Sequence, residues 1–124
     1  MLDTDICSYL IKKNPASLQD KFTTHVGSIC MSTVTCAELL FGAEKRASDA
    51  LSRQVSLFIS LVEVVDWDID MARTYARLRN LLALSIDNLD LMIASASLAR
   101  GCILVTNNLK HFDRIPGLEV ERWS

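Results

Sequence analysis

Residues 102–108 read CILVTNN, and this stretch decides how the chain folds. Four apolar residues stand in a row, Gly101 precedes them, and Asn107 and Asn108 follow the closing threonine. Such a run, without polar alternation, is typical of a strand that is covered on both faces. It predicts a buried strand in a layered α/β domain, with the two asparagines in the turn at its carboxyl end.

Helical and strand-like segments alternate along the rest of the chain. We expect helices over residues 6–13, 17–24, 36–46, 49–61, 69–84 and 88–100. Shorter apolar runs predict strands over residues 1–2, 28–32, 62–67 and 118–123. Thr33 or Thr35 is expected to cap the helix over 36–46. This order predicts a three-layer α/β/α fold with a central, mainly parallel sheet, formed by residues 1–124 as one domain.

The composition limits the classes of partner and compartment. Thirteen Lys and Arg residues against fifteen Asp and Glu leave a formal net charge of −2, so nucleic-acid binding would need a local basic patch. The four cysteines are scattered, which indicates buried thiols in a reducing compartment rather than a disulfide framework. We expect no signal peptide and no membrane-spanning run, so the predicted location is the cytoplasm.

Four polar or acidic residues stand near the predicted strand ends or helix starts. These are Asp3 after the first strand, Glu38 and Asp90 in the first turns of two helices, and Asn108 after the strand at 102–106. The carboxyl ends of parallel strands meet at one edge of a sheet, where ligands commonly bind. The four residues are therefore expected to converge at that edge.

Most of these residues also have a simpler structural explanation. Taken alone, Asp3 is best explained as the N-cap of the first helix, with Asp5 favoured in the first turn by the helix dipole. Asp87 and Asp90 resemble an N-cap followed by an acid three residues later. Asn108 alone is typical of a turn.

Glu38 is harder to explain structurally, because residues 37 and 39–41 around it are apolar. Gly42 lies one turn further on the same side and costs about 1 kcal/mol relative to Ala in a helix interior. This glycine predicts that another backbone or a ligand approaches closely. Carboxylates gathered at one point raise one another's pKa unless a cation is present, and Mg²⁺ or Mn²⁺ accepts such oxygen ligands.

Four segments together resemble the PIN-domain toxins of bacterial toxin–antitoxin pairs, the VapC type. They are MLDTDICSYLIK (1–12), TCAELLFGAEK (35–45), DLMIASASLARGCILVTNNLKHF (90–112) and IPGLEVERW (115–123). The resemblance covers nearly the whole chain, in the same order and with similar spacing. It implies a PIN-like α/β/α fold and a metal-dependent ribonuclease of the bacterial cytoplasm.

The resemblance also implies roles for individual residues. The family's first acid falls on Asp3, its glutamate on Glu38 and its third acid on Asp90, and these three are expected to hold Mg²⁺, or alternatively Mn²⁺. The fourth position falls on Asn108, which is expected to position water or phosphate. The supporting positions that the resemblance identifies are Thr4, Asp5 and Thr106.

Two departures from the family pattern bear on the site. Many relatives carry Asp where this chain has Asn108, so the lower charge predicts weaker binding of a second metal ion. The segment LLALSIDNLD (81–90) is shorter than the usual loop and lacks its glycine. Asp87 in this segment either adds a carboxylate to the site or caps the helix, and the cap is favoured.

The leading hypothesis is an endoribonuclease that hydrolyses a phosphodiester bond in RNA, with tRNA as one candidate. Its substrate would need a basic rim, although each basic residue taken alone is more simply a solvated side chain. The rim candidates are Lys12, Lys13, Lys45, Arg46, Arg73, Arg77, Arg79, Lys110, His111 and Arg114.

The resemblance implies two protein partners. One is an antitoxin whose tail enters the acidic groove, and the other is a second copy of the chain in a homodimer. The apolar stretches YLIKK (9–13) and SLFISLVEVV (56–65) are candidate surfaces, although such stretches are more commonly core.

Two other classes of function stay open at this point. Asp3-x-Asp5 resembles the opening of haloacid-dehalogenase-type phosphatases, which use an aspartate nucleophile, but Cys7 stands where those enzymes have Thr or Val. The second class is a non-catalytic binding module that keeps its acids only as caps. Such a module predicts no gain in thermal stability when metal is added.

Overall fold

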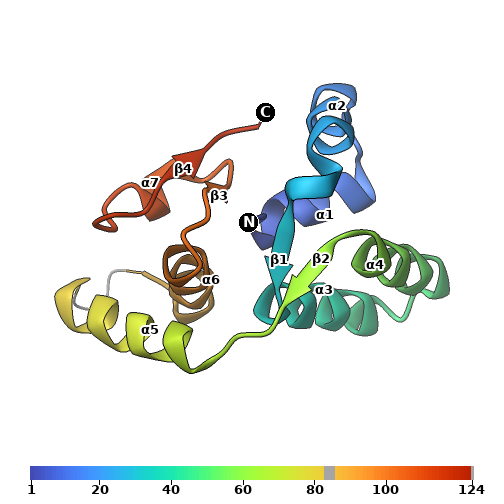
Figure 1. Cartoon of the computed structure of the whole chain (residues 1–124). Helices are drawn as coiled ribbons and strands as arrows, with labels where there is room; N and C mark the ends of the chain where they lie inside the picture. The colour runs from blue at the N-terminus through green and yellow to red at the C-terminus, as the bar shows by residue number, and fades with distance from the viewer. Residues whose placement is uncertain (83–85, 124) are drawn as a thin grey trace.

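The computed structural model describes residues 1–82 and 86–123, and it confirms the predicted alternation of helices and strands (Figure 1). The predicted helix over 69–84 is present, but its last two positions lie outside the described residues. The elements are α1 (Thr4–Lys12), α2 (Ala16–His25), the 3₁₀ helix η1 (Val26–Ser28), β1 (Cys30–Ser32), α3 (Thr33–Arg46), α4 (Asp49–Leu61), β2 (Glu63–Val65), α5 (Ile69–Leu82), α6 (Asn88–Ala99), β3 (Leu104–Val105), α7 (Leu109–Phe112) and β4 (Val120–Glu121).

The first residues of the chain complete a parallel sheet. Strand β1 pairs in parallel with β2, and β3 pairs in parallel with β4. Leu2 forms a parallel bridge with Val105, and its N–H donates to the Cys30 carbonyl across 2.8 Å. The Val105 N–H donates to the Met1 carbonyl, also across 2.8 Å. Residues 1–3 therefore lie between β1 and β3, and the order is β2, β1, residues 1–3, β3, β4.

Leu104 and Val105 face opposite helical layers, as the apolar run at 102–106 predicts. The strand is shorter than predicted, since β3 comprises these two residues only and Ile103 before it is 44% exposed. Val105 packs in one cluster with residues of α1, α2, α3 and α4, whereas Leu104 packs with residues of α5, α6 and α7. Leu2 and Met1 alternate in the same way. In Figure 1 the two groups of helices lie on either side of the N-terminal end of the chain. This arrangement is the expected three-layer α/β/α fold.

Ser32 caps α3, so the prediction of Thr33 or Thr35 as the cap is wrong. The Ser32 side chain accepts a hydrogen bond from the Thr35 N–H at 3.4 Å, and the helix begins three residues earlier than predicted. The Thr33 hydroxyl instead accepts from the Trp67 N–H at 3.1 Å. The sequence did not separate these three positions, because Ser and Thr are both good N-caps.

The four cysteines are free thiols, and most of them are buried. Cys7, Cys30 and Cys36 are buried, and Cys102 is half-buried. None of the helices in the described part of the chain has the length and apolar character needed to cross a bilayer.

Candidate active site

Asp3 lies at the carboxyl end of the N-terminal strand, where it is part of both the sheet and α1. Its backbone N–H donates to the Val105 carbonyl at 3.1 Å. Its Oδ1 accepts from the Ile6 N–H at 2.9 Å, which makes it the N-cap of α1. The residue is only 3% exposed. The cap predicted for Asp3 is thus confirmed, while burial of a carboxylate goes beyond what a surface cap requires.

Glu38 is brought toward Asp3 by the first turn of α1. The Thr4 hydroxyl donates to Glu38 Oε1 across 2.5 Å, and Thr4 directly follows Asp3 in the chain. No other backbone in the described part of the chain approaches Gly42 closely, so that alternative for the glycine beside Glu38 is wrong, while the approach of a ligand stays a prediction. Apart from its chain neighbours and the backbone of its own helix, a Cβ atom at Gly42 would meet no atom of the described residues within 4 Å. The glycine lines a small hollow with Glu38, which explains the open space at this position.

Asp90 lies in the first turn of α6 and contacts the loop that follows β3. Asp87 caps this helix by accepting from the Leu89 N–H at 3.1 Å, as favoured from the sequence. Asp90 Oδ2 lies 3.3 Å from His111 Nδ1, and the same ring nitrogen lies 2.9 Å from Asn108 Nδ2. The structure therefore brings Asp90, Asn108 and His111 together.

Thr106 supports the site from the centre of the sheet edge. Its side chain is fully buried and hydrogen-bonds the Asp3 carboxyl group, which lowers the pKa of Asp3. Its Oγ1 also accepts from the Asn108 N–H at 3.0 Å. Thr106 thus holds both the Asp3 carboxyl group and the start of the loop that follows β3.

The pKa shifts of Asp3, Glu38 and Asp90 indicate that their carboxyl groups are at least partly buried and close to other acids. Burial raises the pKa of Asp3 to about 6, against the opposing hydrogen bonds from Thr106 and Ile6. Burial also raises the pKa values of Glu38 and Asp90, with added repulsion from Asp5 and Asp87. Asp90 itself contributes to the raised pKa of both Asp3 and Glu38. A cation bound among them would relieve both the desolvation and the repulsion.

The donor set fits a hard divalent cation that keeps part of its water shell. Within residues 1–82 and 86–123, no three His, Cys, Asp or Glu side chains form a ready-made metal-binding group. Mg²⁺ usually retains several waters and contacts only one or two carboxylates, so a preformed cage is not required. The carboxylates of Asp3, Glu38 and Asp90 with the Asn108 amide offer oxygen ligands of the type that Mg²⁺ and Mn²⁺ prefer.

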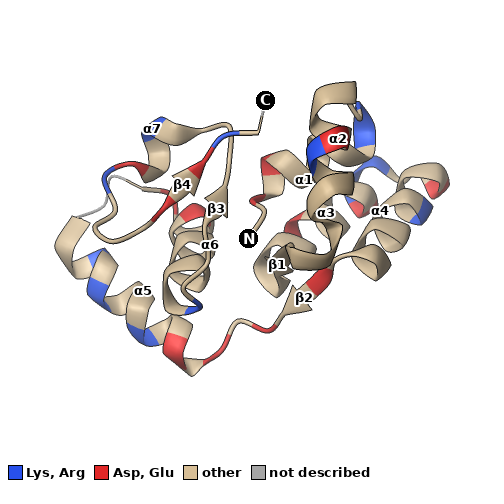
Figure 2. Ribbon diagram, turned by 45° about the horizontal axis from the view of Figure 1, so that its top comes forward, with Lys and Arg blue, Asp and Glu red and all other residues tan. Residues whose placement is uncertain are grey.

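The predicted basic residues do not all lie at the acidic cluster. His111 contacts Asp90, and Lys110 is its exposed neighbour on α7. Lys45 and Arg46 occupy the last turn of α3, about two helical turns beyond Glu38. The candidates Arg73, Arg77 and Arg79 lie on α5, which carries a run of basic positions in Figure 2. The contact of His111 with Asn108 was missed, although their i, i+3 spacing could have indicated it.

Comparisons with known proteins place the chain in a family. The PIN domain family profile matches residues 1–118. The tRNA(fMet)-specific endonuclease VapC of Shigella flexneri is 40% identical, over 100% of this chain and 97% of that relative. A chain in the crystal structure of VapBC2 from Rickettsia felis bound to a promoter DNA fragment superposes with a TM-score of 0.93, at 36% identity over 100% of this chain and 98% of that one. A chain of DNA-bound VapBC from Salmonella typhimurium gives a TM-score of 0.91 at 38% identity, over 100% and 97% of the two chains. The chain therefore belongs to the PIN-domain family and, within it, to the VapC nucleases.

Proposed function

We propose that this chain is a divalent-metal-dependent endoribonuclease and the toxin of a bacterial toxin–antitoxin pair. The observation that carries the proposal is the gathering of Asp3, Glu38 and Asp90 from three separate segments. Burial raises the pKa values of all three, and repulsion from Asp90 adds to the rise at Asp3 and Glu38. Its four free cysteines suit a reducing compartment such as the bacterial cytoplasm.

The three carboxylates would hold Mg²⁺ or Mn²⁺, directly or through water. When bound, such an ion polarises a phosphodiester and makes a bound water more acidic, which favours in-line attack on phosphorus. Thr4 and Thr106 keep Glu38 and Asp3 in place by hydrogen bonds to their carboxyl groups. Asn108 supplies an amide that can orient a water molecule or a phosphate oxygen, beside the exposed His111 ring.

RNA is the proposed substrate, and tRNA is the first form to test. The Shigella flexneri relative is named for cleavage of tRNA(fMet), and other relatives are named ribonucleases. Lys110 and His111 lie beside the acidic cluster and can bind a phosphate of the incoming strand. Lys45 and Arg46 would contact RNA further along α3.

The cellular substrate can be identified by sequencing the 5′ ends of RNA after expression of the wild-type chain and the Asp90→Ala variant side by side. New 5′ ends at defined RNA positions are expected only with the wild-type chain. Equal sets of ends from both chains would contradict the proposal.

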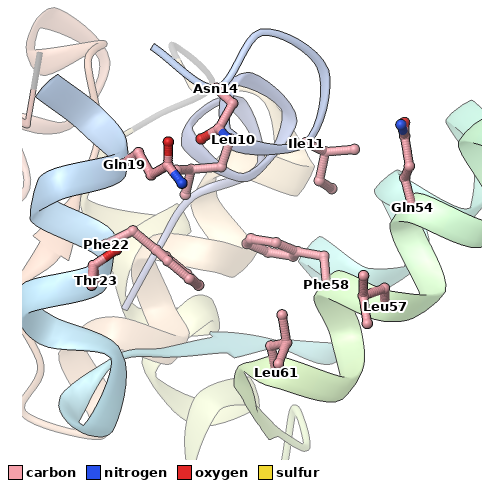
Figure 3. Close-up of a pocket in the computed structure, with 10 residues that line it drawn as sticks. All are labelled: Leu10, Ile11, Asn14, Gln19, Phe22, Thr23, Gln54, Leu57, Phe58 and Leu61. Carbon is pink, nitrogen blue, oxygen red and sulfur yellow. The ribbon is translucent and has the colours of Figure 1, made fainter. Parts of the chain in front are cut away.

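An apolar groove between α1, α2 and α4 is the proposed docking site for the antitoxin (Figure 3). The two apolar stretches singled out in the sequence meet here, since Leu10 and Ile11 face Leu57 and Leu61 across the groove. Phe22 of α2 forms its floor with Phe58, their ring centroids 5.7 Å apart. The groove encloses about 330 Å³, a volume within the usual range of binding pockets.

An apolar segment of an antitoxin is the occupant that suits this groove best. Leu57 is 61% exposed and Leu61 56% exposed, which is unusual for two neighbouring leucines on one helix face. The Rickettsia felis and Salmonella typhimurium structures that resemble this chain are VapBC complexes. We propose that the equivalent antitoxin of this chain covers these leucines.

A homodimer is also part of the proposal. Leu40 and Phe41 on α3 are 49% and 66% exposed and form an apolar surface separate from the groove. Sedimentation of the purified chain and of a Phe41→Lys variant tests this surface. A dimer that persists in the variant, or a wild-type chain that stays monomeric at high concentration, would contradict it.

A further inference from the structure

A hollow with several polar side chains lies near the acidic cluster, and the proposed nuclease mechanism makes no use of it. It is lined by Tyr9, Pro15, Ser17, Leu18, Asn107 and Arg122. It encloses about 300 Å³, which reaches the lower end of the range for small-molecule sites.

The hollow lies at the same sheet edge as the acids. Asn107 stands between Thr106, which bonds Asp3, and Asn108, which contacts His111. Tyr9 belongs to α1, which begins directly after Asp3, and stands roughly 9 Å further along the helix axis. Arg122 follows β4, the strand paired with β3. A strand of nucleic acid that crosses the acidic cluster would therefore pass this hollow.

The C-terminal segment is anchored so that Arg122 is held at the hollow. The Glu121 carbonyl accepts from the Thr106 N–H at 3.0 Å. Trp123, which directly follows Arg122, is 4% exposed, and its ring centroid lies 5.4 Å from that of His25. The Trp123 Nε1–H also donates to Glu121 Oε2 at 2.9 Å. Both neighbours of Arg122 are thus fixed, one to the sheet and one to α2.

The lining has the chemistry of a nucleotide site. Tyr9 is 44% exposed and presents an aromatic face on which a base can stack, with the Lys13 ammonium 5.5 Å from its ring centroid. Arg122 supplies a guanidinium group for a phosphate or a base edge. The Asn107 Oδ1 atom is buried and has no hydrogen-bond partner within the described residues. A buried amide oxygen of this kind is stabilised by a donor from a ligand, such as the amino group of a base.

We propose that this hollow is a subsite for one nucleotide of the RNA, next to the phosphate that is cleaved. Tyr9 stacks on the base, Asn107 contacts the base edge, and Arg122 binds the base or its phosphate. The inference rests on the proposed ribonuclease function, and it identifies positioning residues that influence which RNA sequence is chosen.

Two measurements on the same set of variants test the subsite. The first is the fluorescence anisotropy of a fluorescein-labelled single-stranded RNA hexamer in EDTA, and the second is kcat and KM for RNA cleavage with Mg²⁺. The variants are Tyr9→Leu, Asn107→Ser and Arg122→Gln, with Tyr9→Phe as the conservative replacement. Arg53→Gln on the exposed face of α4 is the matched control for loss of one positive charge.

Loss of stacking at Tyr9 is expected to raise the Kd for RNA about tenfold, and Tyr9→Phe should restore binding to about the wild-type value. KM should rise in the variants while kcat stays close to wild type, since none of these residues belongs to the acidic cluster. A merely structural role would lower the unfolding midpoint without this split between KM and kcat.

The subsite would be overturned if the three subsite variants had the same RNA affinity and KM as the control Arg53→Gln. Cleavage by the wild-type chain would then leave the ribonuclease proposal intact. A wild-type chain that neither binds nor cleaves RNA would overturn both. Should Tyr9→Leu fail to fold, Asn107→Ser and Arg122→Gln give the same comparison.

Discussion

The Thr4 hydroxyl donates to Glu38 Oε1 across 2.5 Å, so the first turn of α1 holds the carboxylate that α3 carries. Thr4 directly follows Asp3 in the chain, so its hydrogen bond to Glu38 keeps these two acidic residues near each other. The contact is short because a hydroxyl bonded to a carboxylate is a charge-assisted hydrogen bond. It lowers the pKa of Glu38 against the effect of burial.

Replacement of Thr4 by Val should release Glu38 from this position. We expect the free energy of unfolding to fall by about 1 kcal/mol, since a half-buried carboxylate loses its partner. Cleavage should fall as well, by less than in Glu38→Ala. Urea unfolding and RNA cleavage measure the two effects, and Thr4→Ser keeps the hydroxyl as a control. Equal behaviour of the Val and Ser variants would show that the hydrogen bond has no role.

The metal-free protein should lose stability as the pH rises from about 4 to above 6. Asp3 ionises near 3.8 in an unfolded chain and near 6 in the folded one, so the folded state binds more protons within this window. The free energy of unfolding therefore falls with rising pH, by roughly 3 kcal/mol in total for this group. Glu38 and Asp90 act in the same direction, since their pKa values are also raised.

Urea unfolding in EDTA across this pH range measures the effect. Asp3→Asn should flatten the pH dependence while keeping the helix cap, because the amide oxygen can still accept from the Ile6 N–H. A slope of equal size in the variant would exclude Asp3 as the titrating group.

Asn108→Asp should strengthen metal binding. The change adds a carboxylate beside Asp90 and His111, and affinity for hard cations rises with the number of ligand charges. We expect the Mn²⁺ concentration that gives half-maximal thermal stabilisation to fall severalfold. Asn108→Ala is the neutral control, and a variant that needs as much Mn²⁺ as the wild-type chain would argue against Asn108 as part of the site.

Leu57→Lys should weaken antitoxin binding without affecting the fold. The side chain is 61% exposed, so a charge there costs little in the free chain but would be buried under an antitoxin segment. Co-purification with the cognate antitoxin should drop at least about tenfold. Ser56→Lys, on the same helix but outside the groove, should co-purify normally. Normal recovery with both variants would place the antitoxin elsewhere.

The strand at Leu104–Val105 illustrates how much of the fold the sequence determines. The apolar run predicted a strand between two helical layers, and Leu104 and Val105 lie in opposite clusters there. Its first part was misjudged, because Ile103 lies outside the strand and is exposed. The N-cap at Ser32 was harder to predict, because Ser and Thr residues that stand close together are all good N-caps. Gly42 indicated open space beside Glu38, but its type could not distinguish a neighbouring backbone, which is absent there within the described residues, from a ligand.

The sequence indicated where the candidate site residues lie in the fold, but not which side chains contact one another. Strand-end positions identified Asp3 and Asn108, since parallel strands bring their carboxyl ends together. The partners Thr4–Glu38 and His111–Asp90 lie 34 and 21 residues apart, and no local pattern links such distant side chains. The hollow at Tyr9 and Arg122 depends on the C-terminal segment, which meets α1 only in the folded chain.

The central claim is that the carboxylates at the sheet edge hold a metal ion that RNA cleavage requires. The most direct measurement is cleavage of a purified tRNA by the wild-type chain and an Asp3→Asn, Asp90→Asn double variant, each with Mg²⁺ and with EDTA. We expect cleavage only by the wild-type chain with Mg²⁺, and a double variant that is folded but inactive. Undiminished cleavage by the double variant, or by the wild-type chain in EDTA, would contradict the account.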